Sequence, residues 1–132
     1  MNTIEKGVLG EKRVEARLIE REYIVSDSME GAPYDLVADD GYSLYKVQVK
    51  TVSNTEEFAE ISLRRISHNT KERKTSQYSD NEVDVYCIYA IDRDEVYWIP
   101  FDVAPSTCIT LRWAEPINGQ TSGVHMADDY CV

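Results

Sequence analysis

The 132-residue chain lacks several features that would assign it to a well-defined class of proteins. It has no apolar run of about twenty residues, and its N-terminus has no apolar segment like that of a signal peptide. Its three cysteines are odd in number and widely spaced, which fits neither a disulfide framework nor the ligand spacing of a zinc site. We therefore expect a soluble, cytoplasmic protein with no membrane association.

Positive charge is also scarce, because 14 lysines and arginines stand against 24 acidic residues, for a net charge of −10. An acidic surface with so few lysines is typical of a salty cytoplasm, and we expect a haloarchaeon or one of its viruses as the source. Most nucleic-acid-binding domains are basic, so the overall charge argues against DNA binding.

The basic residues are concentrated in one segment, which predicts a positive patch on an acidic body. They are Arg64, Arg65, Lys71, Arg73 and Lys74. Such a segment can bind the phosphates of a nucleic acid. The alternative is an ordinary solvated loop.

Residues 34–51 have the pattern of a β-hairpin, with two β-prone runs around an Asp-Gly dipeptide that favours a two-residue turn. With that turn, Asp35 lies opposite Lys46, and Gln48 and Lys50 share the face of Asp35. A four-residue loop also leaves Asp35 on the face of Gln48 and Lys50, whereas a three-residue loop would put Asp35 on the opposite face. An acid, an amide and a lysine on one face can hold a divalent metal beside a positive charge. The alternative is a hairpin with a solvated polar face.

An N-terminal helix is predicted over residues 3–22, with Thr3 as its N-cap. A rotation of about 100° per residue gathers five apolar side chains into one stripe. They are Ile4, Val8, Val14, Leu18 and Ile19. Glu11 falls near the middle of this stripe, where a buried carboxylate needs a cation or hydrogen bonds. Glu15 lies in nearly the same direction and is the rival candidate, unless both acids reach solvent.

Several motifs, in this order, resemble the PD-(D/E)XK nuclease superfamily. They are Gly10-Glu11, Tyr34-Asp35-Leu36, Val47-Gln48-Val49-Lys50, a basic stretch, Tyr78, Asp84-Val85-Tyr86 and Tyr97-Trp98-Ile99-Pro100. Over roughly residues 5–113 the chain is similar to the small single-domain branch that includes intron-encoded homing endonucleases. Archaeal Holliday-junction resolvases are more distant relatives. Two departures stand out, because Tyr34 separates Pro33 from Asp35 and Gln48 replaces the usual second acid.

The resemblance implies a metal-dependent DNA endonuclease whose catalytic residues are Glu11, Asp35, Gln48 and Lys50. Asp35 would be the principal metal ligand, with Gln48 and Glu11 completing the shell around Mg²⁺, or Mn²⁺ as a substitute. A glutamine cannot ionise, but its amide oxygen can still bind a hard cation. Lys50 would orient or deprotonate a water, or neutralise charge on the phosphate. Cutting both strands takes two active sites, so a dimer or tetramer is expected.

The other segments predict an α+β fold with a restriction-endonuclease-like core, in which the N-terminal helix packs on a mixed, mostly antiparallel sheet. Strands are expected at residues 58–66, 83–91, 95–99 and 108–113, and a long loop or partly helical insertion at residues 67–82. The hydrophobic pattern is lost from residue 115 onward. We therefore assign a nuclease-like domain to residues 1–114 and a tail, flexible or swapped between subunits, to residues 115–132.

The sequence leaves two other functions open. Gln48 in place of an acid allows a non-catalytic nucleic-acid-binding protein on the same fold. The negative charge allows an acidic interaction protein, such as a DNA mimic that occupies another nuclease. Such a mimic would have no need of a lysine two residues after Gln48. The leading prediction is an endonuclease of the homing or junction-resolving type.

Overall fold

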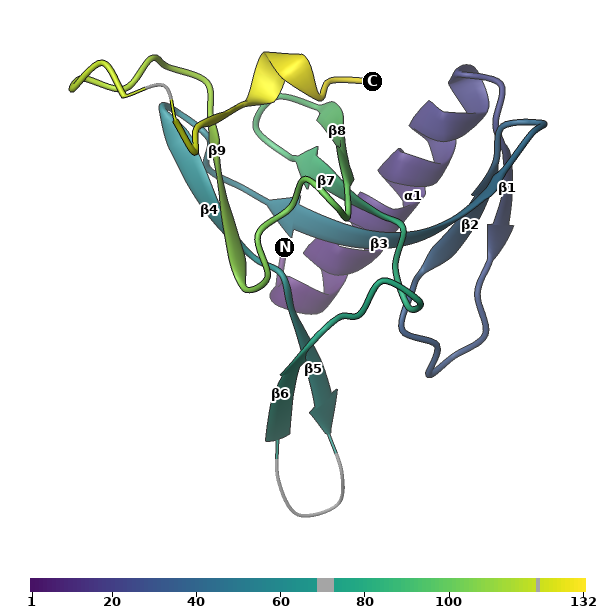
Figure 1. Cartoon of the computed structure of the whole chain (residues 1–132). Helices are drawn as coiled ribbons and strands as arrows, with labels where there is room; N and C mark the ends of the chain where they lie inside the picture. Colours follow the sequence, from purple (N-terminus) through teal and green to yellow (C-terminus); the bar gives the residue numbers. More distant parts are fainter. Residues whose placement is uncertain (69–72, 121) are drawn as a thin grey trace.

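The computed structural model describes the backbone of residues 1–68, 73–120 and 122–132, and their side chains except those of residues 67, 68, 73 and 74. In this part of the chain, a helix packs on a five-stranded sheet, beside a three-stranded sheet and a two-stranded hairpin (Figure 1). The helix is α1 (Thr3–Glu20). The strands are β1 (Ile24–Asp27), β2 (Leu36–Asp39), β3 (Leu44–Val52), β4 (Phe58–Ser62), β5 (Arg64–His68), β6 (Arg73–Gln77), β7 (Val85–Ala90), β8 (Glu95–Pro100), β9 (Cys108–Arg112) and β10 (His125–Met126), followed by the short helix η1 (Ala127–Asp129).

The sheets are ordered β1-β2-β3-β7-β8, β10-β9-β4 and β5-β6. In the five-stranded sheet only β3 and β7 run parallel, so the predicted mixed, mostly antiparallel sheet is confirmed. Every residue of the central strand β7 is buried, as its continuous β-prone sequence predicts. Helix α1 covers one face of this sheet, and the β4–β9 sheet packs against the other.

Helix α1 is capped by Asn2, whose Oδ1 accepts a hydrogen bond of 2.8 Å from the Glu5 amide. The predicted cap, Thr3, is instead the first helical residue. Three members of the predicted apolar stripe are also exposed, since Ile4, Val8 and Ile19 keep 78%, 51% and 55% of their surface. The buried residues of the helix are Gly10, Val14 and Leu18.

Gly10 explains why the buried face of α1 differs from the predicted stripe. A Cβ at this position would collide with the Oγ1 of Thr51 on β3, so the backbones approach as only a glycine permits. The helix therefore turns Gly10 toward the sheet together with Val14 and Leu18, while the other three members of the predicted stripe stay exposed. Hydropathy alone gives no signal of this contact.

The β2–β3 hairpin has a four-residue turn, residues 40–43, instead of the predicted two-residue turn. Asp40 fixes it by accepting hydrogen bonds of 2.8 Å from the amides of Tyr42 and Ser43. Leu36 consequently pairs with Val47, and the Asp35 amide donates to the Val47 carbonyl, so Asp35 does not lie opposite Lys46. The predicted register is wrong by two residues, which leaves the predicted faces unchanged.

Residues 58–82 also differ from the prediction. The strand expected at 58–66 is broken at Leu63, and part of the expected loop at 67–82 forms β6, which pairs with β5. Leu63 is fully buried whereas Arg64 and Ile66 are exposed, so the chain leaves the core after Leu63. The resulting β5–β6 hairpin projects from the body as an arm (Figure 1).

The C-terminal segment packs against both the three-stranded sheet and the five-stranded sheet. β10 runs parallel to β9, and the Tyr130 carbonyl accepts a hydrogen bond of 2.8 Å from the Trp98 amide on β8. Ala127 is fully buried in the core. The loss of hydrophobic pattern after residue 115 therefore marks irregular backbone that is still anchored to the sheets.

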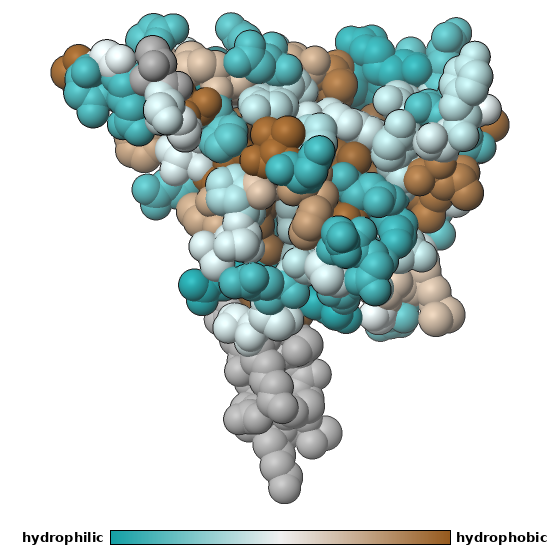
Figure 2. Space-filling model, viewed as in Figure 1, coloured by the Kyte–Doolittle hydropathy of each residue, from teal (hydrophilic) through white to brown (hydrophobic). Residues whose placement is uncertain are grey.

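The face shown in Figure 2 is largely hydrophilic, and its apolar side chains form small, separate patches. This agrees with the acidic composition of the chain. In the described part of the chain, no helix is both long and apolar enough to cross a membrane.

Candidate active site

Asp35 lies where β2 begins to pair with β3. Its amide donates to the Val47 carbonyl at 2.8 Å, and its Oδ2 accepts from the Val49 amide at 2.9 Å. In a continued ladder, a backbone carbonyl of the neighbouring strand would occupy the position of this Oδ2. The carboxylate of Asp35 is therefore held in the plane of the sheet, at the edge of β3.

Glu11 reaches Asp35 from helix α1. The close packing of Gly10 on Thr51 brings this turn of the helix onto β3, and Glu11 and Asp35 line the same pocket. Burial raises the pKa of Glu11, and the charge of Asp35 raises it further. Burial also raises the pKa of Asp35, although the Val49 amide opposes this change. Two buried carboxyl groups this close favour a proton or a cation between them.

Gln48 and Lys50 approach Asp35 from β3. Gln48 lines a pocket of about 300 Å³ together with Asp35, Arg65 and Tyr78. The Lys50 Nζ donates to the carbonyl of the first residue of β5 at 3.4 Å, and its charge favours the ionised form of Asp35. Burial lowers the pKa of Lys50, which Asp35 partly offsets.

The structure thus gathers the other three predicted catalytic residues, Glu11, Gln48 and Lys50, around Asp35. Glu11 and Asp35 line one pocket, of about 480 Å³, while Gln48 and Asp35 line the other. Asp35 belongs to both pockets, so it joins the helix side of the site to the β3 side.

Two residues considered with this group lie outside it. The Lys46 Nζ donates to the Asn81 carbonyl, so the expected pairing of Lys46 with Asp35 is wrong. Glu11 lines a pocket with Asp35, whereas Glu15 lines neither of the two pockets that contain Asp35. Glu11 is therefore the better of the two helix candidates.

Three further residues contribute to the surroundings of the site without having been predicted to do so. Tyr78 lines the pocket of Gln48, with its ring centroid 5.7 Å from the Lys50 Nζ. Glu82 forms an ion pair of 2.6 Å with Arg65. Asp84 binds the β3 backbone, because its Oδ2 accepts from the Lys46 amide at 2.8 Å. The sequence offered a signal for two of them, because Tyr78 and Asp84 belong to the motifs that resemble the nuclease superfamily.

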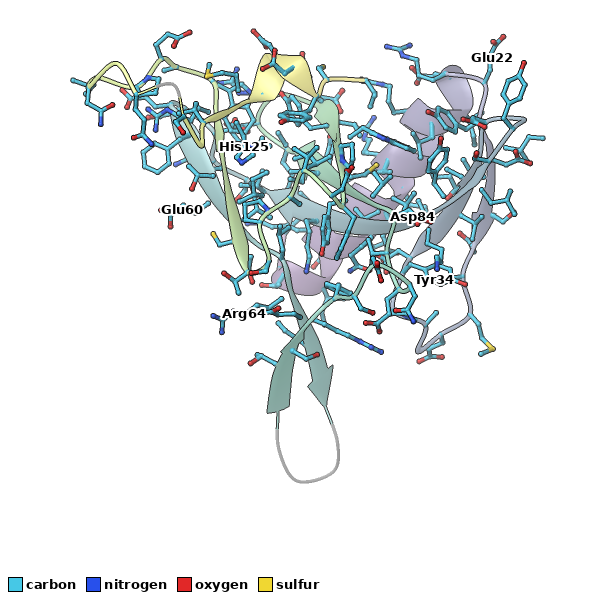
Figure 3. All side chains as sticks on the ribbon, in the orientation of Figure 1. Glu22, Tyr34, Glu60, Arg64, Asp84 and His125 are labelled. Carbon is cyan, nitrogen blue, oxygen red and sulfur yellow. The ribbon has the colours of Figure 1, made fainter. Side chains whose placement is uncertain are left out.

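Four of the five predicted nucleic-acid-binding residues belong to the strands of the β5–β6 arm. Arg64 lies where the arm leaves the body, as labelled in Figure 3, and Arg65 is the next residue of β5. Arg73 and Lys74 begin β6, but their side chains are outside the described part of the structure. Lys71 lies outside the described residues altogether.

The donor set of the site fits a hard divalent cation. Carboxylate oxygens from Glu11 and Asp35 and the amide oxygen of Gln48 are ligands of the type that magnesium accepts. The described residues contain no group of three acidic, histidine or cysteine side chains that could hold a metal, so the carboxylate pair would need the amide or waters to complete a shell. A cation would also relieve the repulsion that raises the pKa of Glu11.

Comparisons with known proteins agree with this geometry. Residues 1–132 match the family model described as PD-(D/E)XK endonuclease. The fold is similar to the solved structure of a bacterial homing endonuclease, I-Ssp6803I, with a TM-score of 0.77 and 24% sequence identity over 99% of this chain and 89% of that one. A comparison with curated proteins gives no match.

Proposed function

Because the chain belongs to the PD-(D/E)XK endonuclease family, we propose that it is a metal-dependent enzyme that hydrolyses phosphodiester bonds in DNA. The family assignment supports a nuclease that acts on DNA, and PD-(D/E)XK nucleases generally use divalent metals. The observation that carries the proposal is the Asp35 carboxylate, which accepts from the Val49 amide and lines one pocket with Glu11 and another with Gln48. Mg²⁺ is the proposed cofactor, with Mn²⁺ as a substitute.

Glu11, Asp35 and Gln48 would hold the metal. When bound, a divalent ion stabilises charge on a phosphate and makes a nearby water more acidic. The Val49 amide fixes the orientation of the Asp35 carboxylate, so this ligand needs little reorganisation when substrate binds. Glu11 places a second carboxylate at the same point from the helix.

Lys50 would act on the β3 side of Asp35. Its ammonium would donate a hydrogen bond to the attacking water or to the phosphate oxygen that gains charge. The partial burial of Lys50 strengthens such an interaction, because water competes less for its protons.

The β5–β6 arm is the proposed DNA-binding element, through Arg64, Arg65, Lys71, Arg73 and Lys74. A two-stranded ribbon is narrow enough to enter the major groove of DNA. Its basic sequence contrasts with the remainder of the chain, so it would direct DNA to the pocket at its base. We further propose a homo-oligomer, since two sites are needed to cut both strands, and a homing-like or junction-resolving role.

The test is incubation of the protein with supercoiled, linear and four-way-junction DNA, with Mg²⁺, Mn²⁺ or EDTA, at low and molar salt. We expect cleavage that requires the metal. Asp35→Asn and Lys50→Met should each lower the rate by about 100-fold or more, because each removes a group that acts in the transition state.

The chain provides matched controls for two of the catalytic positions. Lys46→Met changes a lysine four residues earlier on the same strand, and Glu15→Gln changes an acid one turn after Glu11. Both should leave cleavage close to that of the unchanged protein, while Lys50→Met and Glu11→Gln should not. Equal losses in the variants and their controls would contradict the assigned site.

A non-catalytic DNA-binding protein on the same fold is the second candidate, because Gln48 replaces an ionisable ligand with a neutral one. Binding of DNA without cleavage under every metal and salt condition would favour it. Gln48→Glu would then be expected to restore metal-dependent cleavage. If no DNA is bound at all, the acidic interaction protein becomes the better explanation.

A further inference from the structure

The two ends of the β5–β6 arm both contact the ammonium group of Lys50. The Lys50 Nζ donates to the carbonyl of Arg64, the first residue of β5, at 3.4 Å. It also lies 5.7 Å from the ring centroid of Tyr78, the residue directly after β6. This distance is within the range of a cation–π interaction. The lysine is therefore held at the point where the arm joins the body.

The Tyr78 ring is itself held in place by other aromatic side chains. It packs edge-on against Tyr86 of β7, with ring centroids 5.9 Å apart, and Tyr86 stacks on Phe101 at 6.0 Å. Tyr86 is almost fully buried, so it provides a rigid support. The ring of Tyr78 consequently has a defined position relative to the core, and so does the charge above it.

An ion pair closes the base of the arm beside this ring. Arg65 on β5 binds Glu82 at 2.6 Å, and Glu82 also accepts from the amide and hydroxyl of Ser79, at 3.1 and 2.8 Å. Ser79 directly follows Tyr78. The first residues of β5 and the residues after β6 are thus tied to one another next to Lys50.

We propose that Tyr78 is a positioning residue that holds the Lys50 ammonium toward Asp35 through its aromatic ring, and that the base of the arm thereby links bound DNA to the catalytic lysine. This inference rests on the proposed function, because it assigns Tyr78 a role toward Lys50. Lysine has a long, flexible side chain, and only a few of its rotamers direct the ammonium to the site. The ring and the Arg64 carbonyl select among them.

The first test does not depend on nuclease activity. In protein labelled with ¹³C-lysine, the ε-protons of Lys50 lie near the face of an aromatic ring, so their NMR signal should be shifted upfield. Tyr78→Phe keeps the ring and should keep the shift, whereas Tyr78→Leu should lose it. Tyr45→Leu is the matched control, since Tyr45 is a half-buried tyrosine of β3 that packs edge-on against Trp98, at 5.3 Å, away from Lys50.

The second test separates positioning from a purely structural role. Tyr78→Leu should lower kcat by about 10- to 100-fold with DNA affinity unchanged, since a misplaced catalytic group costs rate and not binding. Tyr78→Phe should stay within about threefold of the unchanged protein, because the ring is retained. In a Lys50→Ala background, Tyr78→Leu should cause no further loss.

Several results would overturn the proposal. They are an unshifted Lys50 signal in the unchanged protein, a shift that survives in Tyr78→Leu, or an equal loss of kcat in the presence and absence of Lys50. If Tyr78→Leu does not fold, Tyr78→Met keeps much of the volume without a ring and carries the same expectations. If the unchanged protein does not cleave DNA, the proposed function fails, while the NMR result still decides whether Tyr78 positions Lys50.

Discussion

At the scale of single residues, Asp35 performs two tasks with one side chain. It satisfies the Val49 amide, which β2 leaves without a backbone partner at this point, and it lies against the Glu11 carboxyl group. The first task stabilises the fold, whereas the second opposes it, because burial and the neighbouring acid disfavour the charged form. If Asp35 and Glu11 bind a cation as proposed, the protein maintains that site at a cost in stability.

Asp35→Asn should therefore raise the melting temperature at pH 7. The asparagine keeps an oxygen for the Val49 amide and removes the charge. The pKa of Asp35 is higher in the folded protein than in the unfolded chain, so the charged carboxylate destabilises the fold. This destabilisation is complete above the pKa of the folded state and decreases as the pH falls through that pKa. It is absent below the pKa of the unfolded state, about 3.9. The gain should shrink accordingly as the pH is lowered toward 4. Melting curves of both proteins from pH 4 to 8 measure it, and a lower melting temperature at pH 7 would contradict it.

Addition of Mg²⁺ should raise the melting temperature of the unchanged protein, since a ligand bound only by the folded state stabilises it. The same addition should have little effect on Asp35→Asn, which lacks the principal ligand. Asp27→Asn, on the rim of the pocket that Glu11 and Asp35 share, is the control and should keep most of the response. Equal responses in all three proteins would place the metal elsewhere.

At the scale of elements, the position of α1 depends on one contact. Gly10→Ala would drive a Cβ into the Thr51 hydroxyl group, so the helix must shift or tilt away from β3. We expect a loss of about 1–3 kcal/mol in the free energy of unfolding, as for other overpacked cores. Cleavage should fall as well, because the shift moves Glu11 away from Asp35.

Thr51→Ala tests the cause of that loss, because it removes the atom that the new methyl group would strike. The double variant should regain most of the stability lost in Gly10→Ala alone, as measured by denaturant unfolding. Losses that simply add would show that the glycine matters for another reason, such as backbone flexibility.

The elements themselves could largely be predicted from the sequence, and the contacts between them could not. Alternation of side chains identified the β2–β3 hairpin and predicted that Asp35, Gln48 and Lys50 lie on one face of it. This prediction holds because a turn longer by two residues leaves every side chain on the same face. The buried face of α1 was predicted only in part, since Val14 and Leu18 are buried but the Gly10–Thr51 contact depends on a residue with no side chain. β6 was missed because its polar sequence, Arg73–Gln77, forms a strand only by pairing with β5 outside the core.

At the scale of the whole molecule, a polar network links the five-stranded sheet to the β4–β9 sheet. Thr55, fully buried between β3 and β4, donates to Asp92 at 2.8 Å and accepts from the Arg93 Nε at 2.7 Å. The Arg93 guanidinium also lies 5.0 Å from the ring of Trp113, just after β9. The β7–β8 turn is thereby joined to both neighbouring segments.

Thr55→Val should lower the free energy of unfolding by about 1–3 kcal/mol, because the buried Thr55 hydroxyl makes hydrogen bonds to Asp92 and Arg93 that valine cannot replace. Thr75→Val, on the exposed part of β6, is the control and should change stability little. Denaturant unfolding of both variants measures the difference. Similar values for the two would mean that the network does not stabilise the junction of the sheets.

The net charge of −10 predicts opposite effects of salt on stability and on DNA binding. Salt screens the repulsion among the acidic residues, so the melting temperature should rise from low to molar KCl. Affinity for DNA should fall over the same range, because contacts to phosphates release counterions. Replacing Glu56, Glu57 and Glu60 by glutamine removes three acidic charges and should reduce the gain in melting temperature without changing the salt dependence of binding.

The β5–β6 arm begins and ends at paired positions, since Arg64 lies opposite Gln77 and Ile66 opposite Thr75. A foreign hairpin joined between residues 66 and 75 would therefore meet the body at two points that are already side by side. Such a graft would leave Arg64, Arg65 and Tyr78 in place around Lys50. If the arm binds DNA as proposed, replacing the hairpin should change the preferred DNA sequence. The proposed catalytic residues, which lie outside the hairpin, would stay the same.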